Sequence, residues 1–234
     1  YKLMNKISIN KCVGGAWDLT TKHWIMCIIM LVTLVIVSIG SGSTSQTTVY
    51  NTGSMTPEES LRMLKETFSH SFGVFTLVVY IVQYAIYAGL YKMAINGYNG
   101  KKVDTSAYKM PFATYVKFIA AYIVYGILTA VGLCLCIIPG IIIGVRFMFT
   151  PLIILDEPET EIIEAFKKSW AMTGGNFWNL VLLYIVVLLI NLVGIICCCI
   201  GVIFTATMAI FISVIAYYQL KDNVNDFGQP VTEI

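Results

Sequence analysis

Long uncharged segments separated by short polar ones dominate the pattern of this sequence. The segments 23–57, 67–91 and 169–220 contain no Asp, Glu, Lys or Arg, and the segment 118–155 contains only Arg146. A helix of about 20 apolar residues crosses the roughly 30 Å hydrocarbon core of a bilayer. The first two segments each have room for one such helix, and the last two each have room for two helices joined by a tight turn.

The pattern therefore predicts an all-α integral membrane protein, a six-transmembrane helix bundle of three hairpins with amphipathic interfacial helices. We treat residues 1–234 as a single membrane domain. No short apolar core with a small-residue cleavage site follows the N-terminal segment, so we expect the first helix to be retained rather than cleaved. The predicted transmembrane helices cover residues 24–40, 72–92, 113–137, 140–155, 176–197 and 201–220.

The polar segments between these helices have their own patterns. Residues 5–21 form a predicted interfacial segment and residues 41–71 a predicted outer loop. In 158–173, two acids precede Pro158 and two glycines follow Thr173, which predicts an amphipathic helix on the cytoplasmic side. Its apolar face either lies in the membrane interface or packs on the underside of the bundle. Aromatic residues beside these segments are predicted interfacial anchors, namely Trp17, Trp24, Trp170, Phe177 and Trp178.

Composition and charge fix the class and the orientation. Hydrophobic residues make up 58% of the chain and charged residues 12%, about half of the share in a soluble domain. Most lysines lie before residue 23 or between 92 and 117, whereas Arg62 and Lys65 are the basic residues of the outer loop. Because positively charged loops stay in the cytoplasm, we expect both termini there. The lysines are explained by this topology, so the net charge of +2 does not indicate a nucleic-acid partner.

Two internal similarities indicate a repeat. A shift of 62 positions aligns Val131-Gly132 with Val193-Gly194, and a shift of 153 aligns Trp17 with Trp170. An internal repeat of this kind implies hairpins that all enter from the cytoplasm. Many transporters use inverted repeats instead, so the pattern argues mildly against alternating access.

Arg146 is the candidate for function. Counting along a straight helix places it near the middle of the membrane, where a charge costs about 2.5–3.5 kcal/mol and needs a partner. Every Asp and Glu falls in a predicted loop or tail. Three interpretations stay open: a structural latch to polar groups and backbone carbonyls, a site for an anion such as a lipid phosphate, or a contact on a permeation path. The candidate ligand or lipid-binding residues are Arg146, Asn191, Gln83, Thr129 and Tyr80.

Tyrosines follow helical spacing on the second and third predicted helices. Tyr80, Tyr84 and Tyr87 recur in this way on the second, and Tyr115, Tyr122 and Tyr125 on the third. These stripes form packing surfaces or offer aromatic faces on which a guanidinium can stack.

The seven cysteines do not have the spacing of a zinc site. Cys134, Cys136 and Cys198 fall at the outer ends of predicted helices with no His or carboxylate near them in sequence. We interpret them as small apolar residues and keep them as weak candidates for a metal site or a disulfide.

An enzyme is not expected from these residues. His23 and His70 are predicted on opposite sides of the membrane, and no nucleophile or phosphate-loop motif occurs. The interpretation favoured is a non-enzymatic protein without a cofactor, either a lipid-interacting module or a scaffold or subunit of a membrane complex. The alternative is a small transporter or channel for an anionic or amphipathic solute. Expected partners are membrane lipids, including anionic phospholipid, and a protein partner or second copy.

The stretch from Ile138 to Leu180 carries a family resemblance. It resembles the membrane domain associated with glycerophosphoryl diester phosphodiesterases and related bacterial six-helix membrane proteins. The matching positions are Pro139, Gly140, Arg146, Ser169, Trp170, Thr173 and Trp178. The resemblance implies the six-helix fold and a bacterial inner-membrane location. In that family the phosphodiesterase chemistry belongs to a separate soluble domain, so the resemblance implies no catalytic residue.

Overall fold

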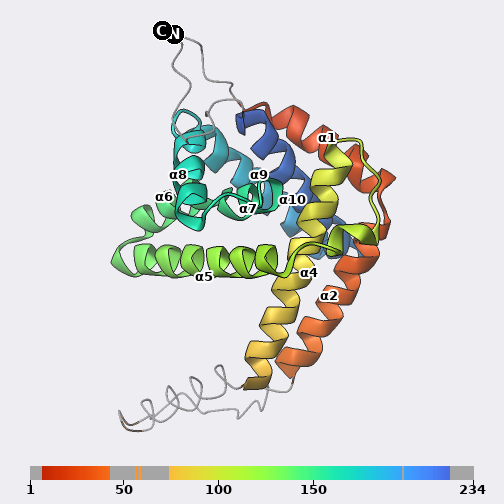
Figure 1. The fold of residues 1–234 in the computed structure, drawn as a ribbon, viewed down its shortest axis with the longest axis horizontal. Helices are drawn as coiled ribbons and strands as arrows, with labels where there is room; N and C mark the ends of the chain where they lie inside the picture. Colours follow the sequence, from red (N-terminus) through yellow and green to blue (C-terminus); the bar gives the residue numbers. More distant parts are fainter. Residues whose placement is uncertain (1–6, 43–55, 57, 59–73, 197, 222–234) are drawn as a thin grey trace.

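The computed structural model describes residues 7–42, 56, 58, 74–196 and 198–221, which form helices, turns and loops without a strand (Figure 1). The all-α prediction is confirmed for these residues. In chain order the elements are α1 (Ile9–Lys22), α2 (Ile25–Gly42), α4 (Val74–Tyr98), the short 3-10 helix η1 (Thr105–Tyr108), α5 (Phe112–Leu135), α6 (Ile137–Phe147), α7 (Thr150–Asp156), α8 (Ile162–Thr173), α9 (Phe177–Ile196) and α10 (Cys198–Lys221).

Within the described residues, five helical segments are long and apolar enough to cross a membrane. They are Val78–Tyr98, Phe112–Leu135, Ile137–Asp156, Phe177–Ile196 and Gly201–Lys221. The third segment joins α6 and α7. The 18-residue helix α2 lies beside α4 (Figure 1), which is the neighbour predicted for it. The full layout of six spans in three hairpins stays a prediction, and most of the outer loop 41–71 lies outside the described residues.

Three element boundaries differ from those expected from the sequence. The helix predicted to end at residue 92 continues to Tyr98, because Lys92 marks the end of the apolar segment and a lysine does not end a helix; its ammonium donates to the carbonyl of Leu155 (2.6 Å). The helix predicted over 140–155 is broken between α6 and α7. The amphipathic helix predicted from 158 begins at Ile162, because the Glu157 N–H donates to Ile153 and closes α7.

Each of the short elements α1, η1 and α8 packs on one or two other helices. α1 packs on α10, η1 on α4, and α8 on α6 and α7. η1 approaches α4 closely because Gly89 has no side chain. A Cβ there would collide with the ring of Tyr108, whose hydroxyl donates to the Ile86 carbonyl (3.2 Å). Short elements are thereby held on the ends of the long helices.

Small residues let the helices of two pairs, α5–α6 and α9–α10, approach each other closely near the turn within each pair. In the α5–α6 pair, a Cβ on Gly132 would lie 3.0 Å from the Cα of Gly140. In the α9–α10 pair, a Cβ on Gly194 would collide with the side chain of Thr205. Gly132 and Gly194 are 62 positions apart and were aligned in the sequence, so aligned positions have the same packing role. Close backbone approach at small residues is a common way to join membrane helices.

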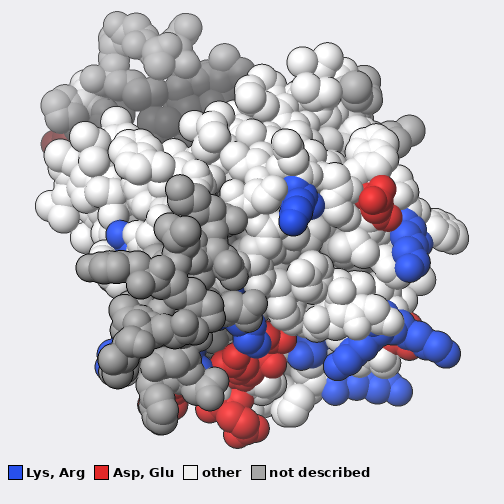
Figure 2. Space-filling view, turned by 90° about the horizontal axis from the view of Figure 1, so that it is seen from above, with Lys and Arg blue, Asp and Glu red and all other residues white. Residues whose placement is uncertain are grey.

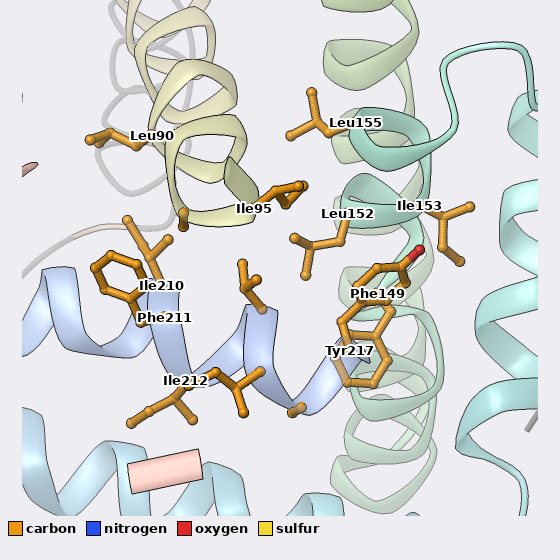
Figure 3. Packing of buried hydrophobic residues seen from close by; sticks show 14 of the residues in the cluster. Leu90, Ile95, Phe149, Leu152, Ile153, Leu155, Ile210, Phe211, Ile212 and Tyr217 are labelled. Carbon is orange, nitrogen blue, oxygen red and sulfur yellow. The ribbon is translucent and has the colours of Figure 1, made fainter. Parts of the chain in front are cut away.

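The buried core lies where α4, α7 and α10 meet (Figure 3). Phe149, just before α7, lies beside Tyr217 of α10, with ring centroids 6.1 Å apart, and Ile95 of α4 lies near Leu152 of α7. By contrast, the outer faces of α5 and α9 expose apolar side chains such as Ile127 and Val193, each 58% exposed. Exposed apolar helix faces of this kind are typical of helices that face lipid.

Candidate functional site

The break between α6 and α7 determines where Arg146 lies. Pro151 in the first turn of α7 has no N–H, so it cannot donate to the carbonyl of Phe147 one turn earlier. Membrane helices tolerate such breaks where hydroxyls of a neighbouring helix satisfy freed backbone groups. The sequence motif PLIILDE therefore already contained the cause of the break.

Hydroxyl groups of α8 satisfy the carbonyl of Arg146 at this break. The Ser169 hydroxyl donates to it over 2.8 Å, and the Thr173 hydroxyl lies 3.5 Å from it. Ser169 and Thr173 are fully buried, as is Ala165 on the same face of α8. The small side chains let α8 approach the break closely, so α8 and α6 are joined at the residue that carries the guanidinium.

The guanidinium of Arg146 lies against the last turn of α8 and the start of α9. Its Nη1 donates to the Trp170 carbonyl over a long 3.4 Å, and its Cζ lies 4.7 Å from the Trp170 ring and 5.7 Å from the Phe177 ring. The carbonyls at a helix C-terminus carry partial negative charge, and aromatic faces attract cations. Both features stabilise the positive charge without a carboxylate.

The guanidinium nevertheless keeps hydrogen-bonding capacity. Among the described residues no carboxylate pairs with Arg146, and its buried Nε donates to none of them. A buried donor without a partner costs about 1–3 kcal/mol, so such groups indicate a strained site or a binding site.

The surroundings of Arg146 are apolar and exposed. Trp170 is 46% exposed, Trp178 79% and Ile163 68%. Exposed tryptophans beside an amphipathic helix are typical of the membrane–water interface. Phe166 and Trp170 also contact the ring of Phe147, with centroids 5.0 and 5.5 Å away. α8 thus packs on α6 and α7, as one interpretation of the amphipathic helix expects, and still exposes apolar side chains; its position in the membrane interface stays a prediction.

The structure brings Arg146 to a backbone carbonyl of α8, that of Trp170, and gives it no bond to Asn191 or Gln83 among the described residues. The depth of Arg146 in the membrane stays a prediction. The Asn191 amide donates to Val187 in its own helix (2.9 Å). Thr129 lies near Gly144, on the other side of α6. Gln83 is partly exposed and Tyr80 is 51% exposed, both on α4. A ligand-binding role for these four residues stays a prediction.

The other predicted site residues fall in two places. Trp17 contacts Phe204 of α10, with ring centroids 5.1 Å apart, and Trp24 is exposed. Cys134 and Cys136 are exposed free thiols at the far end of α5, and the side chain of Cys198 lies outside the described residues. In the described part of the chain no three His, Cys, Asp or Glu side chains come together as a metal site would require.

Sequence reasoning missed an ion cluster at the end of α7. Asp156 accepts hydrogen bonds from Tyr217 (3.1 Å) and Tyr218 (2.9 Å) and pairs with Lys221. Glu157 pairs with Lys221 and with Lys168 of α8, both at 3.0 Å. The two acids had been assigned to the start of an amphipathic helix. The sequence did contain a signal. Asp156 and Glu157 directly follow one long apolar segment and Lys221 directly follows another, so these charged residues are expected at the ends of membrane helices.

Burial alone would raise the pKa of Glu157, but hydrogen bonds and charge from Lys221 and Lys168 outweigh it and hold this pKa below its usual range. Lys117 of α5 donates to the Pro158 carbonyl nearby (2.8 Å). In Figure 2 most charged side chains gather along one side of the visible face, and much of the rest carries none. The ion cluster thus belongs to a charged layer at one end of the helices.

These features define a multi-pass helical membrane domain with an arginine held between interfacial aromatics. Residues 115–221 match the family described as the membrane domain of glycerophosphoryl diester phosphodiesterase, which confirms the resemblance expected from the sequence. The chain is also 24% identical over 228 residues to uncharacterised proteins of Mycobacterium bovis and Mycobacterium tuberculosis, and the similarity covers 92% of this chain and 69% of each relative. No solved structure matches.

Proposed function

We propose that this chain is a non-enzymatic bacterial inner-membrane protein that interacts with membrane lipid, with six transmembrane helices and both termini in the cytoplasm. The observation that carries the proposal is the guanidinium of Arg146, which lies among exposed aromatic side chains with a buried donor that none of the described residues accepts. The family match supports the membrane setting.

The surroundings of the acids support a non-enzymatic role. Asp156 and Glu157 are held by lysines and tyrosine hydroxyls from α8 and α10, an arrangement suited to joining helix ends. A general acid or base would have to release its partners to take up a proton. Lipid interaction needs only the cation, the aromatic surface and the apolar faces of the helices.

Native mass spectrometry of the protein purified in mild detergent tests this proposal. We expect a series of peaks heavier than the bare chain by the mass of phospholipid, and the same lipids in an organic extract of the sample. A membrane protein of similar size prepared in the same detergent serves as the reference for carry-over. Bare protein throughout, together with recovery of a stoichiometric protein partner from native membranes, would replace the lipid role with the scaffold role.

A further inference from the structure

The geometry around Arg146 points to a defined ligand, a phosphodiester lipid with an uncharged head alcohol and one net negative charge, bound with its phosphate on the guanidinium and an acyl chain between α6 and α9. This inference rests on the proposed lipid interaction and names its ligand. Four observations lead to it: the donors of the guanidinium, the apolar side chains beside it, the partners already bound to the nearby carboxylates and aromatic rings, and the exposed backbone of Gly174 at the end of α8.

The first step is the donor set of the guanidinium. Of its N–H groups, Nη1 uses one on the Trp170 carbonyl, and the Nε is without an acceptor among the described residues. The rings of Trp170 and Phe177 lie against the cation and the Nε atom is buried, so an incoming anion first meets the Nη groups of this partly exposed residue. Arginine matches phosphate oxygens with a fork of donors, which makes phosphate the preferred anion.

The second step is the apolar path that leaves the cation. Ile142 lies one turn before Arg146 on the same side of α6 and is 36% exposed. On α9, Val181 follows Phe177 by one turn and Ile185 follows by a second, and Ile185 is exposed. α6 and α9 contact each other, so these two rows of apolar side chains belong to neighbouring helices. The acyl chain of a lipid bound at Arg146 would contact these apolar side chains, whereas inorganic phosphate would not.

The third step argues against a positively charged headgroup, whose ammonium group would have to rely on the exposed ring of Trp178. An ammonium group needs a free carboxylate or a free aromatic face. Glu157 and Glu164 already pair with Lys168, at 3.0 and 3.6 Å, and the faces of Trp170 and Phe177 carry Arg146. A phosphate ester of glycerol or another neutral alcohol leaves no charge unpaired here, whereas a choline or ethanolamine ester does.

The fourth step is the open backbone beside the cation. Gly174 is exposed, and a Cβ on it would lie 3.5 Å from the Nη1 of Arg146. Its backbone is right-handed helical, with φ −53° and ψ −52°, so its dihedral angles suit a larger residue, and the added Cβ would also lie 3.2 Å from the carbonyl oxygen of Ala171. Gly174→Val therefore keeps the positive charge while it crowds the approach to the guanidinium.

The test titrates delipidated protein with dioctanoyl phosphatidylglycerol or dioctanoyl phosphatidylcholine and follows the bound fraction by native mass spectrometry. We expect wild type to prefer phosphatidylglycerol, and Arg146→Gln and Gly174→Val to bind it at least about tenfold more weakly, a factor that corresponds to about 1.4 kcal/mol. Arg146→Lys keeps the charge without the fork and should fall in between. Lys167→Gln removes an exposed charge from the same helix and should change affinity less than about twofold.

Each other outcome overturns a defined part. Equal affinity for both lipids would overturn the neutral head alcohol. Displacement of the lipid by millimolar inorganic phosphate would make the site one for free phosphate. Lipid retained unchanged by Arg146→Gln and Gly174→Val would overturn this site and leave the lipid module standing, whereas wild type without lipid would also overturn the proposed function. A circular-dichroism melt of each variant identifies any that lose affinity through unfolding.

Discussion

Arg146 joins two helices with its backbone and its side chain at once. Its carbonyl accepts the hydroxyl of Ser169, and its guanidinium lies on the ring of Trp170 one position further along α8. The same short segment of α8 therefore fixes both the break in the membrane helix and the direction of the cation. A shift of α8 has to move the guanidinium.

The hydroxyl at position 169 should contribute measurably to stability. We expect Ser169→Ala to lower the free energy of unfolding by about 0.6–1.7 kcal/mol, because it leaves the carbonyl of Arg146 with only the more distant hydroxyl of Thr173 as a donor. Chemical unfolding in mixed micelles, followed by tryptophan fluorescence, measures the difference.

Ser213→Ala is the matched control for that change. The Ser213 hydroxyl bonds to Ala209 within α10, so its loss frees no group at a helix break and should cost less than Ser169→Ala. Equal losses in the two variants would show that the hydroxyl at 169 has no special role at the α6–α7 break.

At the scale of the elements, short helices are docked on long ones by single close contacts. η1 depends on the space beside Gly89, into which the ring of Tyr108 inserts. We expect Gly89→Leu to displace η1 and to expose the 99–111 segment to protease, because the added side chain occupies the volume of the ring. Limited proteolysis with trypsin at Lys101, Lys102 and Lys109 measures the effect.

The variant Gly126→Leu provides the comparison for Gly89→Leu. Gly126 also lies inside a long helix, but a Cβ there meets no atom within 4 Å. It should leave the rate of cleavage in 99–111 unchanged. If Gly89→Leu is cleaved no faster than Gly126→Leu, the docking of η1 does not depend on this contact.

Glu157 should make the ion cluster between α7, α8 and α10 sensitive to acid. Because its folded pKa is lowered, its contribution to stability is fully present above the ordinary glutamate pKa of about 4.3 and is lost as the pH falls through the lowered folded value. We therefore expect wild type to lose more stability than Glu157→Gln when the pH is lowered from about 5 to 3. Thermal unfolding at a series of pH values measures this difference.

The exposed residue Glu159 serves as the control for that pH series. Glu159→Gln removes a carboxylate two positions away and should follow the wild-type profile. A Glu157→Gln profile that runs parallel to wild type would mean that other carboxylates cause the acid sensitivity.

At the scale of the whole molecule, the charged layer and the lysine-rich segments predict one orientation. Alkaline phosphatase fused after residue 50 should be active in the periplasm, and the same enzyme fused after residue 100 should be inactive in the cytoplasm. A green fluorescent protein fused after residue 100 should give the reverse result. Activity of the phosphatase at both positions would contradict the six-span layout and the cytoplasmic C-terminus.

The sequence by itself determined that the chain is helical, that it lies in a membrane and roughly where the long helices begin and end. These properties follow from the length and uniform apolarity of local segments. Such segments form helices in a membrane because their backbone groups must be hydrogen-bonded within the segment. The same local reasoning predicted helix boundaries within a few residues for α5, α9 and α10.

Only the tertiary structure decided what the charged residues do. The partners of Arg146 are more than 20 positions away, and those of Asp156 more than 60, so no local pattern identifies them. The proline that accompanies the break between α6 and α7 can be seen in the sequence, but the hydroxyl that binds the carbonyl of Arg146 comes from Ser169 of α8. Long-range contacts depend on how whole helices pack. That packing placed Arg146 against α8 and brought Asp156 and Glu157 to the lysines of α8 and α10.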